Sequence, residues 1–320
     1  MNLKNLGLGL LAALLLASCR NDDDGILPGS TVPPRDLDEV ALENDADIRE
    51  FLQTHFYNYE EFDNPPAGFD YQIRIDTLAG DNADKTPLIE QMQTEIIQIT
   101  PEQVGVDQDL GNVAHTLYYL SVRDGVGVSP TIGDSVLVRY QGSYLDGRSF
   151  DANPNFQWQE LPFFLRGYQE AMKHFSSGTL GSLVVNPDGT SEIDDRGVGL
   201  LILPSGLGYF SDTSTGIIAY SPLIFRVDLG LVVEDTDSDG DGIPNIMEDL
   251  NNNGYLYDDN TDEAQELQAF TAILRPNFLD TDDDSDGRPT REEIEIDAQG
   301  NITFPDSDGD GTPDYLDRDS

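Results

Sequence analysis

The sequence predicts an α+β protein in which an antiparallel sheet surrounds one short helix, with a helical and extended region before it and an irregular acidic domain after it. Three observations lead to this prediction: strand-like segments between turn residues in the middle of the chain, a single amphipathic helix among them, and acidic residues at fixed spacing near the end. The chain has 320 residues, 38% of them hydrophobic, which suffices for two or three domains with a buried core.

Residues 1–19 have the pattern of an export signal peptide. In "MNLKNLGLGLLAALLLASC" a lysine and an apolar run precede small residues, and the run is too short for a spanning helix. The last four residues resemble the lipobox of bacterial lipoproteins, in which the cysteine, here Cys19, is acylated and becomes the mature N-terminus. An ordinary secretory signal with an incidental cysteine is the alternative. Cys19 is the only cysteine, so neither a disulfide nor a thiolate metal site is expected within the chain.

Residues 20–37 are rich in Asp, Gly and Pro, which predicts a flexible tether between a membrane and the folded protein. The tether begins with "RNDDDG", which resembles the acidic tags that send some lipoproteins to the outer face of the cell; a plain solvated linker is the alternative. We therefore expect a lipid-anchored protein of the cell envelope, in the outer membrane, on its periplasmic or surface face.

Residues 38–113 form an N-terminal region to which we assign no role. Apolar residues from Asp38 to Tyr57 approach helical spacing, which predicts a helix there. Further along, "YQIRID" alternates between apolar and polar residues and is the best strand prediction of this region.

Residues 114–233 contain strands and turns around one helix. The predicted strands include "TLYYLSV", "DSVLVRYQGSYL", "LLILP" and "PLIFRVDLGLVV", and "SLVVNPDGTSEI" predicts a hairpin around its NPDG turn. The segment "RGYQEAMKHF" predicts a helix whose apolar face, at positions i, i+3, i+4 and i+7, consists of Tyr168, Ala171, Met172 and Phe175.

Several ordered segments of this region resemble an FKBP-type peptidyl-prolyl isomerase domain: "GDSVLVRYQGSYLDGRSFDAN", "LRGYQEAMKHFSSG", "LPSGLGYF" and "SPLIFRVDL". The resemblance implies a curved antiparallel sheet around one short helix, and a pocket of aromatic side chains that accepts a prolyl ring. The site residues that it implies are Tyr140, Phe150, Asp151, Phe156, Leu165, Tyr168, Tyr209 and Phe225.

The resemblance also implies roles for four of these residues. The backbone N–H of Leu165 would hold a substrate carbonyl, Asp151 would orient the hydroxyl of Tyr140, and the hydroxyl of Tyr209 would fix the flanking chain. The alternative is that the aromatic residues only form a core.

Three departures from the family pattern put catalysis in question more than the fold. Tyr168 stands where the pocket floor is most often tryptophan, and Phe210 stands where glycine is usual. A hairpin is also inserted after Gly178.

Residues 234–320 contain three acidic windows of twelve residues with one shared pattern. Each window has aspartate at positions 1, 3 and 5, glycine at 6, proline at 8 and an acid at 12. An EF-hand-like calcium loop takes oxygen ligands from these acidic positions and from the backbone carbonyl at position 7. The predicted calcium ligands are Asp237, Asp239, Asp241, Ile243, Glu248, Asp282, Asp284, Asp286, Arg288, Glu293, Asp306, Asp308, Asp310, Thr312 and Asp317.

Long helices do not flank these windows, so they are not paired EF-hands. Windows such as "DSDGDGTPDYLD" more closely resemble thrombospondin type 3 calcium repeats. Calcium is favoured over magnesium because it accepts six to eight oxygen ligands. A weaker fourth window begins at Asp249. A disordered acidic tail is the alternative. The predicted calcium is structural, and no cofactor is expected for catalysis.

The sequence thus predicts a peptidyl-prolyl isomerase that assists the folding of exported proteins, is anchored by lipid and is stabilised by calcium. Its expected partners are polypeptide clients that contain proline, and a membrane. A non-catalytic surface binding or spacer protein with the same fold is the alternative. With 61 acidic against 17 basic residues, a formal charge of −44 excludes nucleic acid as a partner. A hydrolase finds no support, since the three histidines are scattered along the chain.

Overall fold

The computed structural model describes residues 33–269 and 273–320, so the predicted signal peptide and most of the predicted tether lie outside the described residues. In the N-terminal region, α1 (Leu37–Thr54) is followed by β1 (His55–Tyr57), α2 (Tyr59–Asp63) and β2 (Ile75–Thr77). In the described part of the chain no helix has both the length and the apolar character needed to cross a membrane.

The predicted N-terminal helix is confirmed, but it ends three residues earlier than expected. His55 has an extended backbone, and its Nδ1 lies 2.9 Å from the carbonyl oxygen of Phe51, one of the last carbonyls of α1. Residues 55–57 then pair with β2. The strand expected over "YQIRID" is shorter than predicted, since β2 begins only at Ile75.

The described residues include the end of the segment predicted to be a tether. The backbone N–H of Leu37 donates to Gln108 Oε1 at 3.0 Å, and Gln108 Nε2 donates to the carbonyl of Arg35 at 2.9 Å. Leu37 itself is fully buried. The last residues of the predicted tether therefore belong to the folded protein.

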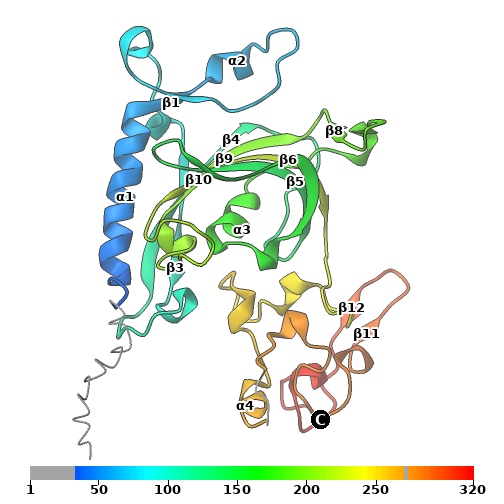
Figure 1. Cartoon of the computed structure of the whole chain (residues 1–320). Coiled ribbons are helices and arrows are strands. Elements are labelled where there is room, and N and C mark those ends of the chain that lie inside the picture. Colours follow the sequence, from blue (N-terminus) through cyan, green and yellow to red (C-terminus); the bar gives the residue numbers. More distant parts are fainter. Residues whose placement is uncertain (1–32, 270–272) are drawn as a thin grey trace, which may run out of the picture. The chain divides into compact units, whose positions relative to one another are not determined.

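A six-stranded antiparallel sheet forms the centre of the fold, with the strand order β3-β4-β9-β10-β5-β6. One short helix, α3 (Arg166–Met172), packs against one face (Figure 1). This arrangement confirms the predicted α+β class. The strands are β3 (Gln93–Ile99), β4 (Val113–Arg123), β5 (Ser135–Tyr144), β6 (Ser149–Glu160), β9 (Gly197–Leu203) and β10 (Leu223–Val233).

Strand β9 is buried on both faces of this sheet. Its seven residues are all buried, and alternate side chains enter two different cores. Leu201 packs with Met172 of α3, whereas Leu200 packs with Ile48 and Leu52 of α1. Full burial of each such aliphatic side chain contributes about 1.5–3 kcal/mol. Helix α1 is thus an integral cover of the sheet, and β3 from the same N-terminal region is one of its edge strands.

Helix α1 also holds a loop at the end of β9. Asn44 is 3% exposed, and its side chain donates to the carbonyl of Tyr220 at 3.0 Å and accepts the N–H of Ser205 at 2.7 Å. Ser205 begins a short 3-10 turn that leads directly to Tyr209. A buried amide of the N-terminal helix therefore positions a loop that carries a candidate site residue.

The insertion after Gly178 forms the predicted hairpin, with strands β7 (Leu183–Val185) and β8 (Ser191–Ile193). Its turn includes Gly189 at a φ of +86°, a conformation that glycine adopts without strain.

Residues 234–320 are irregular, as predicted, and consist mainly of loops and short 3-10 turns. The regular elements are α4 (Glu263–Glu266), β11 (Glu295–Ile296) and β12 (Ile302–Thr303). Two small apolar clusters support them: one joins Ile132 to Leu256 and Phe278, and the other is centred on Ile243, Ile294 and Tyr315.

Candidate functional site

Four of the predicted site residues form an aromatic cluster around Phe225 of β10. The ring of Phe225 lies 5.5 Å from that of Phe150 on β6, 5.5 Å from that of Tyr168 on α3 and 6.3 Å from that of Tyr140 on β5. The first two contacts are edge-to-face, an arrangement that aromatic pairs favour. The sheet and its helix thus bring together residues that are 85 positions apart in sequence.

Gly142 on β5 determines where the ring of Phe150 lies. Gly142 is paired with Phe225 in the sheet, and a Cβ atom at this glycine would lie 2.5 Å from the Phe150 ring. The ring can therefore lie over the strand only because position 142 has no side chain.

The hydroxyl of Tyr140 donates to Asp151 Oδ2 at 2.6 Å, which is the contact implied by the family resemblance. Burial, and then the neighbouring Asp151 carboxylate, raises the pKa of Tyr140. Burial and the same carboxylate also raise the pKa of Tyr209. Both hydroxyls stay protonated at neutral pH. That of Tyr140 is donated to Asp151, whereas that of Tyr209 has no acceptor in the described part of the chain.

Leu165 lies at the N-cap of α3, and its N–H has no acceptor within the part of the chain that the structure describes. This N–H is available to a bound carbonyl. Tyr168, in the first turn of the same helix, is only 3% exposed and donates its hydroxyl to Gln159 Oε1 at 3.1 Å.

Phe156 is not brought into the aromatic cluster. Its ring lies 4.9 Å from the guanidinium of Arg139 and next to Gly230. The pairing of β5 with β6 shifts register between Val138 and Tyr140, and Phe156 falls in this irregular part of β6. A bulge changes which side chains face the cluster. The sequence likeness does not show where the bulge lies, so it could not predict that Phe156 lies elsewhere.

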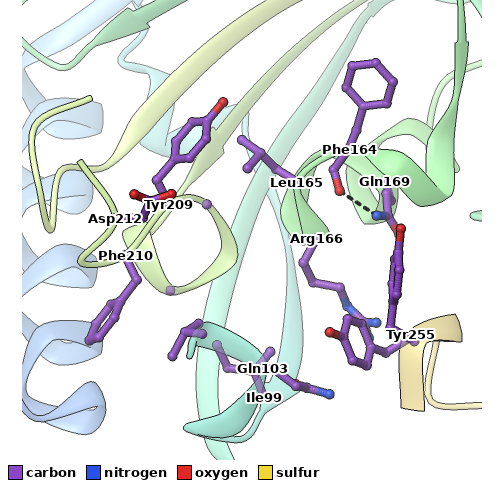
Figure 2. Close-up of a pocket in the computed structure, with 14 residues that line it drawn as sticks. Ile99, Gln103, Phe164, Leu165, Arg166, Gln169, Tyr209, Phe210, Asp212 and Tyr255 are labelled. Carbon is purple, nitrogen blue, oxygen red and sulfur yellow. Dashed lines mark hydrogen bonds between the residues drawn. The ribbon is translucent and has the colours of Figure 1, made fainter. Parts of the chain in front are cut away.

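A cavity of about 370 Å³ lies between the start of α3 and the loop that carries Tyr209 (Figure 2). Of the predicted site residues, only Leu165 and Tyr209 line it. Neighbours of these two residues, within 164–169 and 206–212, form much of the rest of its wall. Distant parts of the chain complete it, with Ile99 and Gln103 from the N-terminal region and Tyr255 and Tyr257 from the acidic domain among them. Sequence reasoning missed these four residues, because no local pattern indicates that separate segments meet at one cavity.

Arg166 fixes the part of this wall that the acidic domain supplies. Its guanidinium donates to the backbone carbonyls of Gly254 and Asn253, the latter at 2.7 Å, and lies 5.2 Å from the ring centre of Tyr255. Glu170, one turn along α3, binds the same guanidinium at 3.1 Å. The first turn of α3 thus joins the six-stranded sheet region to the fourth acidic window.

Phe210 occupies a backbone conformation that suits the glycine usual at this position. Its φ is +46°, its side chain is 1% exposed, and its ring contacts that of Tyr220 edge-to-face at 5.1 Å. The buried ring therefore compensates for a left-handed backbone.

We expect Phe210→Gly to lower the free energy of unfolding by about 2 kcal/mol. Loss of a buried phenylalanine costs about 3–5 kcal/mol, and relief of the strained backbone returns about 1–3 kcal/mol. Urea unfolding monitored by circular dichroism measures the difference. An unchanged or higher midpoint would show that the backbone strain outweighs the packing of the ring.

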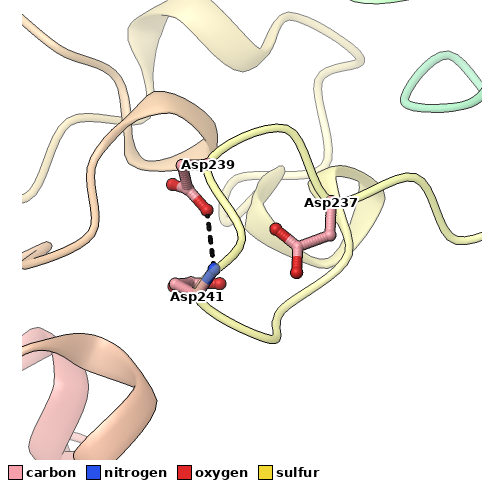
Figure 3. A group of neighbouring side chains, drawn as sticks. All are labelled: Asp237, Asp239 and Asp241. Atoms are coloured by element: carbon pink, nitrogen blue, oxygen red, sulfur yellow. Dashed lines mark hydrogen bonds between the residues drawn. The ribbon is translucent and has the colours of Figure 1, made fainter.

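The first acidic window forms a tight turn around its aspartates (Figure 3). The carboxylate of Asp237 accepts the N–H groups of Gly240 at 2.7 Å and Gly242 at 3.0 Å. Asp239 accepts the N–H of Asp241 at 3.1 Å. These bonds fold the three carboxylates toward one side of the loop.

The third window repeats this turn. Asp306 accepts the N–H groups of Gly309 at 2.7 Å and Gly311 at 3.1 Å, and Asp308 accepts that of Asp310 at 3.0 Å. In all three windows the glycine at position 6 has a φ near +100°: +105° at Gly242, +98° at Gly287 and +103° at Gly311. Only glycine adopts this conformation readily, so the turn itself requires the repeated glycine.

The aspartates of each window converge. One carboxylate oxygen from each aspartate lies within 4.8 Å of the others in three groups, formed by Asp237, Asp239 and Asp241, by Asp282, Asp284 and Asp286, and by Asp306, Asp308 and Asp310. The position-12 acids behave differently. Glu248 groups with Asp241 and with Asp283, whereas Glu293 and Asp317 join none of the groups found among the described residues. Glu293 instead lies 3.5 Å from Arg288 of its own window.

Several of these carboxylates have buried oxygens without a hydrogen-bond partner. Both carboxylate oxygens of Glu248 and of Glu293, and one oxygen of Asp239, have no hydrogen-bond partner in the described part of the chain. Burial and neighbouring carboxylates raise the pKa of Glu248 to about 11 and that of Asp239 to about 7. Buried carboxylates are normally paired or bind a metal, so this donor set fits a hard cation such as calcium.

The weaker fourth window has the same turn, and side-chain amides donate to its carboxylates. Asp249 accepts the N–H groups of Asn253 at 3.0 Å and Gly254 at 2.9 Å. The amides of Asn251 and Asn253 then donate to Asp258 at 3.1 and 2.8 Å. Amide donors thus hold the carboxylate of Asp258, whereas one oxygen of the adjacent Asp259 has no hydrogen-bond partner in the described part of the chain.

A further acidic group lies outside the repeat pattern. Asp262, Glu266 and Asp280 place carboxylate oxygens within 4.8 Å of one another. The backbone N–H of Arg275 donates to both oxygens of Glu266, at 3.1 and 2.9 Å. The fixed spacing of the three windows gave no signal for this group.

Two sequence comparisons place the chain among known proteins. A family model described as BamM C-terminal matches residues 238–305. The peptidyl-prolyl cis-trans isomerase Mip of Coxiella burnetii is 32% identical over 78 residues, which is 23% of this chain. The matched part spans about a third (34%) of the length of that protein.

Solved structures give a weaker likeness. A peptidyl-prolyl cis-trans isomerase from Pseudomonas syringae is 24% identical over 36% of this chain and 74% of its own, with a TM-score of 0.29. FkpA from Escherichia coli is 21% identical over 61% of each chain, with a TM-score of 0.32. In sequence, this chain is thus distantly similar to a peptidyl-prolyl cis-trans isomerase and, in its acidic domain, to the BamM C-terminal family.

Proposed function

We propose that this protein is an FKBP-type peptidyl-prolyl cis-trans isomerase of the cell envelope, that its acidic domain binds calcium, and that its clients are exported polypeptides containing proline. The observation that carries the proposal is the convergence of Tyr140, Phe150, Tyr168 and Phe225 at one end of the sheet, next to Asp151, Leu165 and Tyr209. The 32% identity with the isomerase Mip supports the same activity.

The reaction suits a site of this kind. Rotation about an X-Pro bond breaks no σ bond, but amide resonance imposes a barrier of about 18–20 kcal/mol. A dry aromatic surface disfavours the planar, charge-separated amide relative to the twisted, less dipolar form. The N–H of Leu165 and the hydroxyl of Tyr209 can hold carbonyls of the substrate at fixed positions, whereas the hydroxyl of Tyr140 donates to Asp151. A thousandfold acceleration needs only about 4 kcal/mol of preferential binding to the twisted amide.

The neighbouring cavity gives the client chain a place beside the proline. Leu165 and Tyr209 belong to both the candidate prolyl site and the cavity wall, so an extended chain bound at one enters the other. Tyr255 and Tyr257 offer aromatic surface on the far wall. An apolar or aromatic residue next to the proline fits this wall best.

A non-catalytic binding protein is the second candidate, and two observations favour it. The cavity is lined mostly by residues outside the predicted prolyl site. Phe225 also lies within 5.5 Å of both Phe150 and Tyr168, so the aromatic rings occupy much of their own pocket. Such a protein would hold extended, proline-containing chains without accelerating isomerisation.

Tyr209→Phe distinguishes the two candidates. If Tyr209 holds a substrate carbonyl during rotation, loss of its hydroxyl removes about 1 kcal/mol and lowers the turnover of a short prolyl peptide several-fold. The measurement compares this variant with the wild type of residues 20–320. A wild-type rate equal to the uncatalysed rate, together with unchanged peptide binding by the variant, supports the binding protein instead.

The envelope location rests on the lipobox-like signal and on the family match. A family described as BamM C-terminal, together with an export signal, favours a role in the assembly of outer-membrane proteins. We infer that the chain works near the membrane on polypeptides that have just crossed it.

Cys19→Ala tests the lipid anchor. Residues 1–32 lie outside the described structure, and no described helix is suited to cross a membrane. We expect the variant to be released into the soluble fraction or to remain unprocessed, because acylation is the proposed attachment. Membrane fractionation at high salt checks this. Partition of the processed variant with membranes at high salt would rule out the lipid anchor.

A further inference from the structure

Asp283 is a buried acid that the repeat pattern does not use. It stands at position 2 of the second acidic window, between the predicted ligands Asp282 and Asp284. Its residue exposure is 1%, and neither of its carboxylate oxygens has a hydrogen-bond partner in the described part of the chain. An ionised carboxylate in such a place is strongly destabilising unless a cation or a donor neutralises it.

The Asp283 side chain lies against the first window and not its own. One of its carboxylate oxygens lies within 4.8 Å of oxygens of Asp241 and Glu248, and all three residues are buried. Glu248 likewise has two unpartnered oxygens. Three acids that come from two separate windows thus face one another. Within the described residues, the only hydrogen bond to their carboxylates comes from the N–H of Ile243, which donates to Asp241 Oδ1 at 2.7 Å.

The other two windows show which residue the turn accepts at position 2. Both have serine there, Ser238 and Ser307, and their hydroxyls are satisfied. Ser307 donates to Asp314 Oδ2 at 2.7 Å, and Ser238 accepts from Asn245 Nδ2 at 2.9 Å. The turn therefore needs no acid at position 2, and the carboxylate of Asp283 needs another explanation.

The backbone around Asp283 is held in the same way as in the other windows. Its N–H donates to Thr290 Oγ1 at 3.1 Å, and the N–H of Ser238 donates in the same way to Asn245 Oδ1 at 2.9 Å. Replacement of Asp283 by serine therefore leaves this bond in place and reproduces the residue of the other two windows.

We propose that Asp283 is a ligand of the cation bound by the first window, so that this cation joins the first and second windows. The inference rests on the proposed calcium binding of the acidic domain. Asp237, Asp239, Asp241 and Glu248 supply the rest of the site, with the carbonyl of Ile243. Because Asp282 and Asp284 flank Asp283 and converge on the second site, binding at the first window also orders the start of the second.

The test compares the wild type of residues 20–320 with Asp283→Ser by calorimetric titration with Ca²⁺. Asp297→Ser is the matched control, because it removes the same charge from an exposed turn outside the three acidic windows. We expect Asp283→Ser to weaken one calcium site about tenfold or more, since calcium affinity follows the number of charged ligands. The control should bind as the wild type does.

Thermal unfolding adds a readout that a purely structural role of Asp283 would not give. Without calcium the acidic domain is expected to be unfolded in both proteins, so Asp283→Ser and the wild type should give the same melting curve. With saturating calcium the variant should melt at a lower temperature than the wild type, because it gains less from the ligand.

Each outcome bears on the proposal. If the wild type binds calcium and Asp283→Ser binds it with the same affinity, the proposed role of Asp283 is wrong, whereas the calcium-binding domain is retained. An Asp283→Ser protein less stable than the wild type without calcium also overturns it, since the acid would then serve packing. No calcium uptake by the wild type removes the calcium-binding domain itself.

Discussion

Removal of calcium is expected to unfold residues 234–320 while the six-stranded sheet stays folded. This domain has 27 acidic residues against four arginines and no lysine, a formal charge of −23. Its apolar support consists of two small clusters. Without a cation, repulsion among the acids and the desolvation of buried carboxylates exceed what these clusters supply. The sheet has its own core, formed with α1 and α3, and does not depend on the acidic loops.

Limited trypsin digestion measures this unfolding directly. The domain has four arginines and no lysine, but Arg275 and Arg288 precede proline and resist trypsin, which leaves Arg291, within the second window, and Arg318 as cleavable positions. We expect protection with calcium and rapid cleavage at these arginines after chelation. Magnesium at the same concentration controls for charge screening, because it prefers an octahedral site with several waters. An identical digestion pattern with calcium and with chelator would contradict the calcium-dependent fold.

Phe150→Ala is expected to reduce isomerase turnover roughly ten- to hundredfold. Phe150 is half-buried at the edge of the aromatic cluster, where it contacts both Phe225 and Tyr144. Loss of its ring opens the apolar wall and admits water to the amide, which removes about 1.5–3 kcal/mol of binding to the twisted form. Turnover of a short prolyl peptide, measured with calcium present, checks this.

Two further variants separate the role of this ring from a general loss of stability. Gly142→Ala keeps the ring of Phe150 but displaces it, since the new Cβ would lie 2.5 Å from the ring. It should lower turnover as well. Trp158→Ala removes a large exposed side chain, 54% accessible, from the same strand and should leave turnover unchanged. Full activity of Phe150→Ala in a folded protein would exclude the aromatic cluster as the catalytic surface.

Local patterns predicted the centre of the fold well. Strand β9 reads as a continuous apolar segment because it is buried on both faces, and the amphipathic spacing of residues 168–175 indicated the helix that packs on the sheet. The three windows were equally visible, because a turn built on a left-handed glycine and converging carboxylates fixes residue types at fixed positions.

Features that depend on pairing between distant segments were not predictable. The edge strand β3 alternates weakly and is defined by its pairing with β4, in which Gln93 lies opposite Tyr119. The bulge that takes Phe156 away from the cluster has no sequence signature. Tyr255 reaches the cavity only because Arg166 binds its loop, and Asp283 faces another window instead of its own. Each of these follows from tertiary contacts and not from local spacing.

The rate of cis-to-trans conversion of a short prolyl peptide by residues 20–320, with calcium present, tests the central claim most directly. A peptide with an aromatic residue before proline suits the aromatic wall beside the candidate site. Uncatalysed isomerisation takes tens of seconds at 25 °C, so even a modest acceleration is measurable. The proposed isomerase predicts a rate that rises in proportion to protein concentration and falls in Phe150→Ala. A rate equal to that of the peptide alone, with folded and calcium-loaded protein, would contradict it.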